Sequence, residues 1–210
     1  MRTALRTATA LALAIPLIAS AVPASASSTF LFRERGSFAD VYFEGATDSF
    51  GKGVNYALAQ LTVQGDFTYG FVDLFDCDAG ETPWGDENGE NVCDYVGYYD
   101  AQGDDTVVMT GKGKDASTTI SGTVDLYEAS EEDYALAVED VPFEVTLTPT
   151  GGTSRIKFSG SYRDHETGES YRWSESRVSR EAIADGYFDG IPALGGAVGT
   201  YRVSDMQRIA

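Results

Sequence analysis

The chain has 210 residues, with 15 Lys and Arg against 33 Asp and Glu, and a net charge of −18 at pH 7. Such an acidic chain repels a polyanion at long range and lacks the broad basic surface that nucleic-acid binding requires, so we expect no nucleic-acid partner. The length suits one core of ordinary size, and no linker-like segment divides the sequence.

Residues 1–26 have the three parts of a secretory signal peptide. Two arginines precede an apolar run over residues 10–18, and the small side chains of Ala24-Ser25-Ala26 follow it. The alternative is an uncleaved anchor, but the run is shorter than the roughly 20 residues that a spanning helix needs. We therefore expect cleavage after Ala26, a secreted single domain over residues 27–210, and no membrane span within that domain.

Apolar and polar residues alternate in short runs after the leader, and clusters of Gly, Asp, Asn and Pro separate these runs. Alternation with a period of two is typical of strands that bury one face. The expected strands are Phe38–Glu44, Val54–Val63, Phe67–Cys77, Cys93–Asp100, Thr106–Gly111, Thr118–Tyr127, Val141–Thr148, Arg155–Arg163 and Ser170–Ser179.

The connections between these strands are mostly short, which predicts hairpins between neighbours in sequence. Tight turns are expected at residues 64–66 and 150–153, and a longer turn at residues 165–169. Glu128–Asp140 is expected to be either a helical turn or an acidic loop. After Glu181 the chain is Gly-rich and is expected to be irregular, with room for one last edge strand near its end.

About nine such strands predict an all-β fold, built as a single antiparallel meander. An open sheet of that size would leave long edges exposed, so the meander is expected to close on itself. An up-and-down barrel and a two-sheet sandwich are both compatible with the pattern.

The chain has two cysteines, Cys77 and Cys93, which lie at the ends of two consecutive expected strands. In an exported protein they have each other as internal partner, so we expect a disulfide bond. The alternatives are two free thiols or a bond to another chain.

The segment between the cysteines is rich in carboxylates and contains no Lys or Arg. Its acids, together with those at its base, are Asp76, Asp78, Glu81, Asp86, Glu87, Glu90 and Asp94. Asp86, Asn88 and Glu90 faintly match the oxygen spacing of a calcium-binding loop, although Asn91 stands where such a loop needs glycine. Calcium at these three residues is one interpretation, and a solvated acidic loop without a metal ion is the other.

Aromatic residues surround the same segment. Trp84 lies within it, and Tyr95 and Tyr98 follow in the next expected strand. An exposed indole beside acids suits stacking on a sugar ring or a partner side chain, so these three residues are candidate ligand contacts. The alternative is that they pack in the core or cover the disulfide.

Cations are concentrated in one late segment of the chain. Arg155, Lys157 and Arg163 fall on the polar side of their expected strand, and Arg172 is expected beside them on the next. This pattern predicts a basic stripe, which would bind an anionic ligand or partner. Ion pairing within the molecule, or protection of a sheet edge, would explain the same residues.

The sequence offers little for catalysis. It has no G-x-S-x-G motif, no His-based zinc set and no phosphate-binding glycine loop, and its single histidine, His165, lies in an expected turn. We therefore expect a non-catalytic binding or interaction module for an extracellular ligand or protein, with no cofactor unless calcium binds. The alternative is a small extracellular, glycosidase-like hydrolase that uses paired carboxylates.

Overall fold

The computed structural model is all-β and describes residues 28–51, 53–84, 92–103, 106–129, 134–165 and 167–209. Nine strands are found in this part of the chain, as the sequence predicted, and no helix. They are β1 (Ser28–Ala46), β2 (Tyr56–Gln64), β3 (Phe67–Cys77), β4 (Cys93–Gly103), β5 (Val108–Thr110), β6 (Thr118–Ala129), β7 (Tyr134–Arg163), β8 (Ser170–Phe188) and β9 (Ile191–Ile209).

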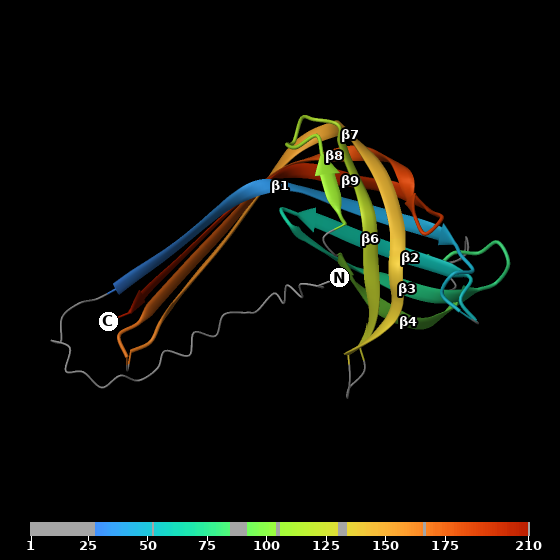
Figure 1. Cartoon of the computed structure of the whole chain (residues 1–210), viewed down its shortest axis with the longest axis horizontal. Helices are drawn as coiled ribbons and strands as arrows, with labels where there is room; N and C mark the ends of the chain where they lie inside the picture. Colours follow the sequence, from blue (N-terminus) through green and yellow to red (C-terminus); the bar gives the residue numbers. More distant parts are fainter. Residues whose placement is uncertain are drawn as a thin grey trace, which may run out of the picture.

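The strands form one antiparallel sheet that closes into a ring (Figure 1). Each strand pairs with its neighbour in sequence, except that β4 passes over the three-residue β5 and pairs with β6 through Asp100–Gly103. Pairing of β1 with β9 completes the ring. The expected closed meander is therefore confirmed, with eight strands in the ring and β5 attached beside it, and we call the closed part the barrel.

The barrel interior is filled by alternate side chains of the ring strands. Its fully buried members include Val41, Phe43, Leu61, Val72, Ile120, Leu126, Val145, Leu147, Phe188, Ile191 and Val198. The alternation that predicted the strands comes from this burial, because only every second side chain points inward.

Two predicted breaks in the chain are wrong. Residues 150–153 do not reverse the chain: they form a bulge within β7, where the pairing register shifts between Pro149 and Thr153. The partner strand β8 is continuous and pairs with β7 on both sides of this bulge. The two glycines therefore bend a single long strand.

The helical turn or acidic loop expected over Glu128–Asp140 is also wrong for the residues that the structure describes. Glu128 and Ala129 end β6, and Tyr134–Asp140 begin β7. The rings of Tyr127 and Tyr134, which face each other across this hairpin, stack with their centroids 5.1 Å apart. Such a contact between residues on different strands cannot be read from the sequence of one segment.

The C-terminal segment is regular rather than irregular. β8 continues to Phe188, and β9 occupies a central position between β8 and β1 instead of an edge. Glycines in β9 permit close packing here: a Cβ on Gly199 would lie 2.7 Å from the ring of Phe38, its partner on β1. β1 is also longer than expected, since it begins ten residues before Phe38.

Candidate functional site

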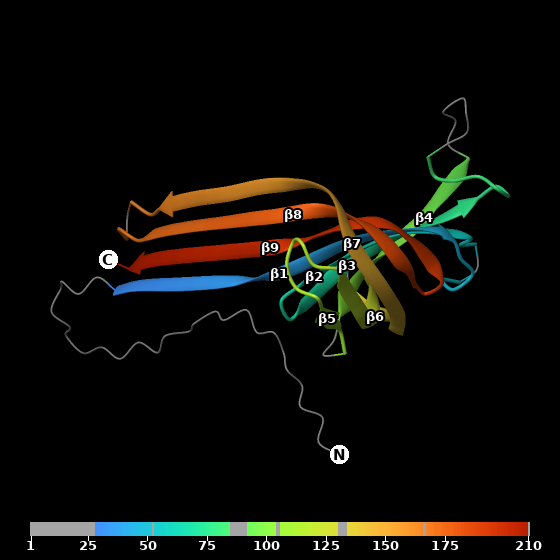
Figure 2. The ribbon, with the colours of Figure 1, turned by 90° about the horizontal axis from the view of Figure 1, so that it is seen from above.

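Four strands of the ring continue beyond the barrel as a single-layered sheet, which we call the arm (Figure 2). The arm consists of residues 28–37 of β1, 153–163 of β7, 170–179 of β8 and 200–209 of β9. Its described side chains are exposed or half-buried, apart from Tyr201 at the root where the arm meets the barrel. The arm therefore has two accessible faces and no core of its own.

One face of the arm, which we call the inner face, is continuous with the barrel interior. Side chains of odd-numbered β1 residues point into the barrel at Ala39, Val41 and Phe43, and the same alternation places Arg33 and Arg35 on the inner face of the arm. The strand register brings cations from all four strands to this face. They are Arg33, Arg35, Arg155, Lys157, Arg163, Arg172 and Arg202.

The charge of the inner face is uniform. These seven side chains are exposed, and no acidic residue occupies a described position on the face. The ion pairs found among the described residues lie elsewhere: Lys114 with Asp115, Arg177 with Glu175, and Arg180 with Asp115. Nearly half of the 15 Lys and Arg residues of an acidic chain thus share one surface, and none of the seven belongs to an ion pair found among the described residues.

A groove of about 650 Å³ crosses the inner face. Ser159, Ser174 and Ser204 lie in register side by side across three strands, and Arg33 continues the row on β1. The next row contains Ser161, Arg172, Met206 and Leu31. The groove thus combines hydroxyl groups, which donate and accept hydrogen bonds, with guanidinium groups, which only donate them.

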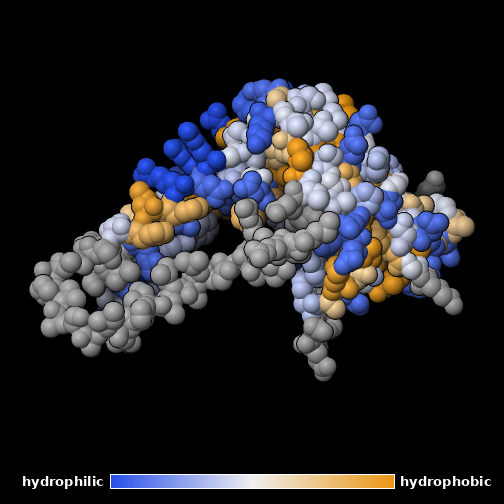
Figure 3. Space-filling view, in the orientation of Figure 1, coloured by the Kyte–Doolittle hydropathy of each residue, from blue (hydrophilic) through white to orange (hydrophobic). Residues whose placement is uncertain are grey.

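The opposite face of the arm, the outer face, carries aromatic and aliphatic side chains. The large exposed residues there are Phe30, Phe32, Ile156, Phe158, Tyr162, Tyr171 and Trp173. The Trp173 indole covers its cross-strand partner Gly160, where a Cβ would be 2.4 Å from the indole nitrogen. The space-filling view shows hydrophobic side chains on the arm close to strongly hydrophilic ones (Figure 3).

Polar contacts fix the root of the arm on its outer side. Arg177 Nε donates to Glu175 at 2.6 Å and Nη2 to Gln64 at 3.0 Å, while its guanidinium lies 5.3 Å from the ring centroid of Phe38. Tyr201 covers Gly36 and donates its hydroxyl to Glu34. Burial, with a further contribution from the Glu34 contact, raises the pKa of Tyr201 to about 12.

A second hollow, of about 350 Å³, lies at this root. It brings Arg35 and Lys112 together with Glu34 and Asp66. Its charges balance, in contrast to those of the groove on the inner face.

The four cations expected to form a stripe do share one face. Arg155, Lys157, Arg163 and Arg172 are all on the inner face of the arm. Sequence reasoning missed the other three. Arg33 and Arg35 lie before the first expected strand, and Arg202 lies in the C-terminal segment, where there was room only for one last edge strand. Residues 30–35 are three apolar residues followed by three charged ones, so no alternation marked this part of the strand.

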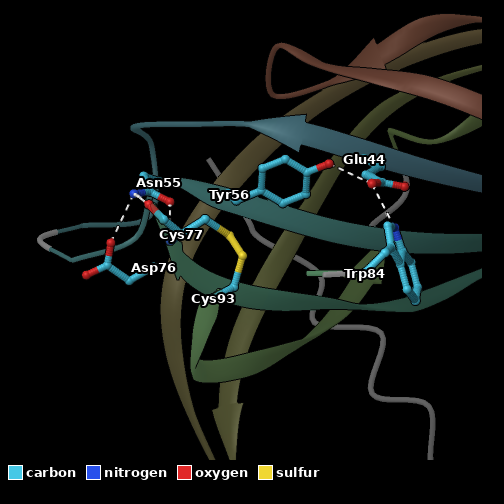
Figure 4. Close-up of a disulfide and its surroundings, with 7 residues drawn as sticks. All are labelled: Glu44, Asn55, Tyr56, Asp76, Cys77, Trp84 and Cys93. Carbon is cyan, nitrogen blue, oxygen red and sulfur yellow. Dashed lines mark hydrogen bonds between the residues drawn. A yellow bond between two sulfur atoms is a disulfide. The ribbon is translucent and has the colours of Figure 1, made fainter. Parts of the chain in front are cut away.

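The opposite end of the barrel carries the disulfide, which is confirmed: Cys77 and Cys93 are directly opposed on β3 and β4, with a Cα–Cα distance of 4.0 Å. The side chain of Asn55 is hydrogen-bonded to the end of β3, beside the disulfide (Figure 4). Its side-chain oxygen accepts from Cys77 N, and its Nδ2 donates to Cys77 O, both at 2.8 Å. Nδ2 also donates to Asp76 at 3.0 Å.

Trp84 lies at the same end, with 70% of its surface exposed. Its indole N–H donates to Glu44 at 2.9 Å, and Tyr56 donates to the same carboxylate oxygen at 2.6 Å (Figure 4). Tyr95 and Tyr98 are exposed on β4, where the Tyr95 ring packs edge-on against Phe75. The aromatic candidates and the basic candidates therefore belong to opposite ends of the molecule.

The suggested calcium ligands Asp86, Asn88 and Glu90 lie outside the described residues. Among the residues that are described, no group of three or more His, Cys, Asp and Glu side chains could hold a metal ion. Calcium binding by the segment between the cysteines stays a prediction.

Among the described carboxyl groups, those of Asp40 and Asp73 have a raised pKa, and burial is the main cause for both. Asp40 accepts from the Thr62 hydroxyl at 2.7 Å, and Asp73 is hydrogen-bonded to Tyr95. Neither faces another carboxyl group across its strand pairs. His165 is exposed in the turn at the tip of the arm, as expected.

The chain matches no family model, no curated protein and no solved structure. In the part of the chain that the structure describes, no helix is long and apolar enough to cross a membrane.

Proposed function

We propose that this chain is an extracellular, non-catalytic binding protein that holds an anionic carbohydrate polymer on the inner face of its arm. One observation carries the proposal: seven exposed cations share a face with no acid at any described position, in a chain with a net charge of −18. Structural ion pairing would place acids beside these cations, as Glu175 lies beside Arg177 on the outer face. Cations without neighbouring acids remain available to an anionic ligand.

The arrangement of polar groups supports a sugar polymer in particular. Arg33 and Arg35 are two residues apart on one strand, so their Cα atoms are about 7 Å apart, and cations on neighbouring strands extend the array sideways. Sulfate, phosphate or carboxylate groups along a polymer can contact several of these cations at once. The row of serines between them offers hydroxyl groups to the hydroxyl groups of the sugar.

The extracellular location rests on the predicted leader and fits the disulfide-bonded all-β fold. β1 begins at Ser28, two residues after the expected cleavage site at Ala26, so cleavage there leaves all nine strands intact. A polymer outside the cell is accessible to a protein in this location.

The disulfide end of the barrel is a poor site for an anionic polymer. Trp84 there is an exposed indole, but its N–H is already bound to Glu44, and the surrounding segment is acidic. That end therefore repels an anionic polymer, whereas the inner face of the arm attracts it.

Binding of fluorescent polymers to the mature protein at low salt tests the proposal. We expect binding of dextran sulfate or of a polyphosphate-bearing glycan, weakening steeply as salt rises, and no binding of uncharged dextran. The two charged polymers distinguish sulfate from phosphate recognition. Absence of binding to both, or tighter binding to duplex DNA than to either, would contradict the proposal.

A further inference from the structure

The outer face of the arm is an apolar surface on a sheet that has no second layer. Phe30, Phe158 and Tyr162 are exposed by 63%, 50% and 66% respectively, and Phe32, Ile156 and Trp173 share their face. Contiguous apolar patches of this extent are uncommon on soluble monomers and usually mark a contact surface. We propose that the outer faces of two copies of the chain pack against each other and form a dimer.

The outer face is shaped for contact with another flat sheet. Two aromatic rings of the arm cover glycines on neighbouring strands: Trp173 covers Gly160, and Tyr201 covers Gly36. Two sheets that pack face to face need such evenly filled surfaces, because their side chains must fit within a layer about 10 Å thick.

The available area is sufficient for a dimer. About ten residues of each of four strands give a face of roughly 34 by 19 Å, from the usual rise per residue and the usual strand spacing. Each copy would bury about 600 Å², so the pair would bury about 1,200 Å², the lower end of the range for stable interfaces.

Repulsion between like charges is weaker between two outer faces than between two inner faces. The described charged groups of the outer face have polar partners. Arg177 forms an ion pair with Glu175, and the carboxylates of Glu34 and Asp205 accept hydrogen bonds from Tyr201 and Tyr171. Two inner faces would oppose seven cations to seven cations, and two barrels would oppose acidic surfaces. Outer-to-outer packing avoids both and leaves each inner face turned away from the dimer contact.

Formation of this dimer does not depend on polymer binding, and the two respond in opposite ways to salt. High salt weakens attraction between the inner face and a polyanion. An apolar contact persists at high salt, and screening of the net charge on each copy strengthens it. A protein that loses the polymer while remaining a dimer at high salt would fit both proposals.

Sedimentation equilibrium of the mature protein in high salt tests the dimer. We expect twice the mass of one chain for the wild type and the mass of one chain for Phe158→Glu, because a buried carboxylate has no partner in the contact. Leu194→Glu is the matched control, since Leu194 is 62% exposed but lies on the barrel part of β9, and it should remain dimeric. Far-UV circular dichroism checks that both variants are folded.

If Phe158→Glu does not fold, Tyr162→Asp at the end of the strand replaces it, with the same expected loss of the dimer. A wild type that stays monomeric at about 100 µM, well above the Kd expected for such an interface, would mean that something other than a second copy covers the face, and would overturn the proposal. A folded outer-face variant that remains dimeric would also overturn it.

Discussion

At the scale of single residues, Tyr201 joins the arm to the barrel. Its ring covers Gly36, its hydroxyl donates to Glu34, and the tip of the ring reaches the turn at Gly65. The contact needs a neutral hydroxyl group, because a phenolate beside the Glu34 carboxylate would place two negative charges together. The root of the arm is therefore sensitive to high pH.

Replacing Tyr201 with Phe tests this sensitivity. The pKa of Tyr201 is about 12 in the folded protein against 10.0 without the fold, so its contribution to stability is present below pH 10 and is lost as pH rises toward 12. We expect the Tm of the wild type to fall more steeply than that of Tyr201→Phe over this range, measured by circular dichroism. Parallel pH profiles would show that Glu34 and Tyr201 do not interact.

Gly186 is another position where the fold depends on one residue. Its φ is +149°, and a Cβ there would lie 2.0 Å from the carbonyl oxygen of Glu144 on the neighbouring strand. We expect Gly186→Ala to reduce the free energy of unfolding by about 2 kcal/mol or more, measured by urea denaturation. Gly97→Ala is the matched control, because no atom lies within 4 Å of a Cβ there, and it should change stability little.

At the scale of elements, the sequence predicted strands well and their ends poorly. Val141–Thr148 and Arg155–Arg163 were each recognisable from alternation, yet they are two parts of β7. Glycine pairs such as Gly151-Gly152 occur both in turns and in bulges, and only the continuous partner strand distinguishes the two. The same limitation hid β9, whose glycines allow close packing rather than breaking the strand.

The residues of the candidate site could likewise be predicted only where they are close in sequence. Arg155, Lys157, Arg163 and Arg172 could be predicted to share a face because they lie within one hairpin, where period and turn fix the register. Arg33 and Arg202 could not be added, because β1 and β9 are far apart in sequence and their pairing is set only when the ring closes. Local patterns thus identified four of the seven cations on the inner face, and the pairing of β1 with β9 adds the other three.

The disulfide stabilises the end of the barrel opposite the arm. It links opposed residues of β3 and β4 and closes a loop of 15 intervening residues. We expect replacement of both Cys77 and Cys93 by Ser to reduce the free energy of unfolding by about 3 kcal/mol, through the larger entropy of the unfolded chain. Urea denaturation measures the change. A stability equal to that of the wild type would mean that the bond does not constrain the unfolded chain.

At the scale of the whole molecule, charge is segregated. The chain is strongly acidic, and its cations are concentrated on the inner face of a projecting arm that the barrel supports at one end only (Figures 1 and 2). The acidic barrel repels polyanions, whereas the inner face of the arm attracts them. A polyanion should therefore bind along the arm. The position of the cations should therefore determine binding, and the net charge should matter less.

Comparison of two double variants with equal net charge tests this claim most directly. Arg33→Gln with Arg172→Gln removes two cations from the groove, whereas Gln60→Glu with Thr148→Glu adds two acids on the outside of the barrel. At low salt we predict that the first pair weakens dextran sulfate binding at least about tenfold, at about 1 kcal/mol per cation, and that the second pair changes it less than about threefold. Equal weakening by both pairs would contradict the account, because binding would then follow net charge alone and not the inner face of the arm.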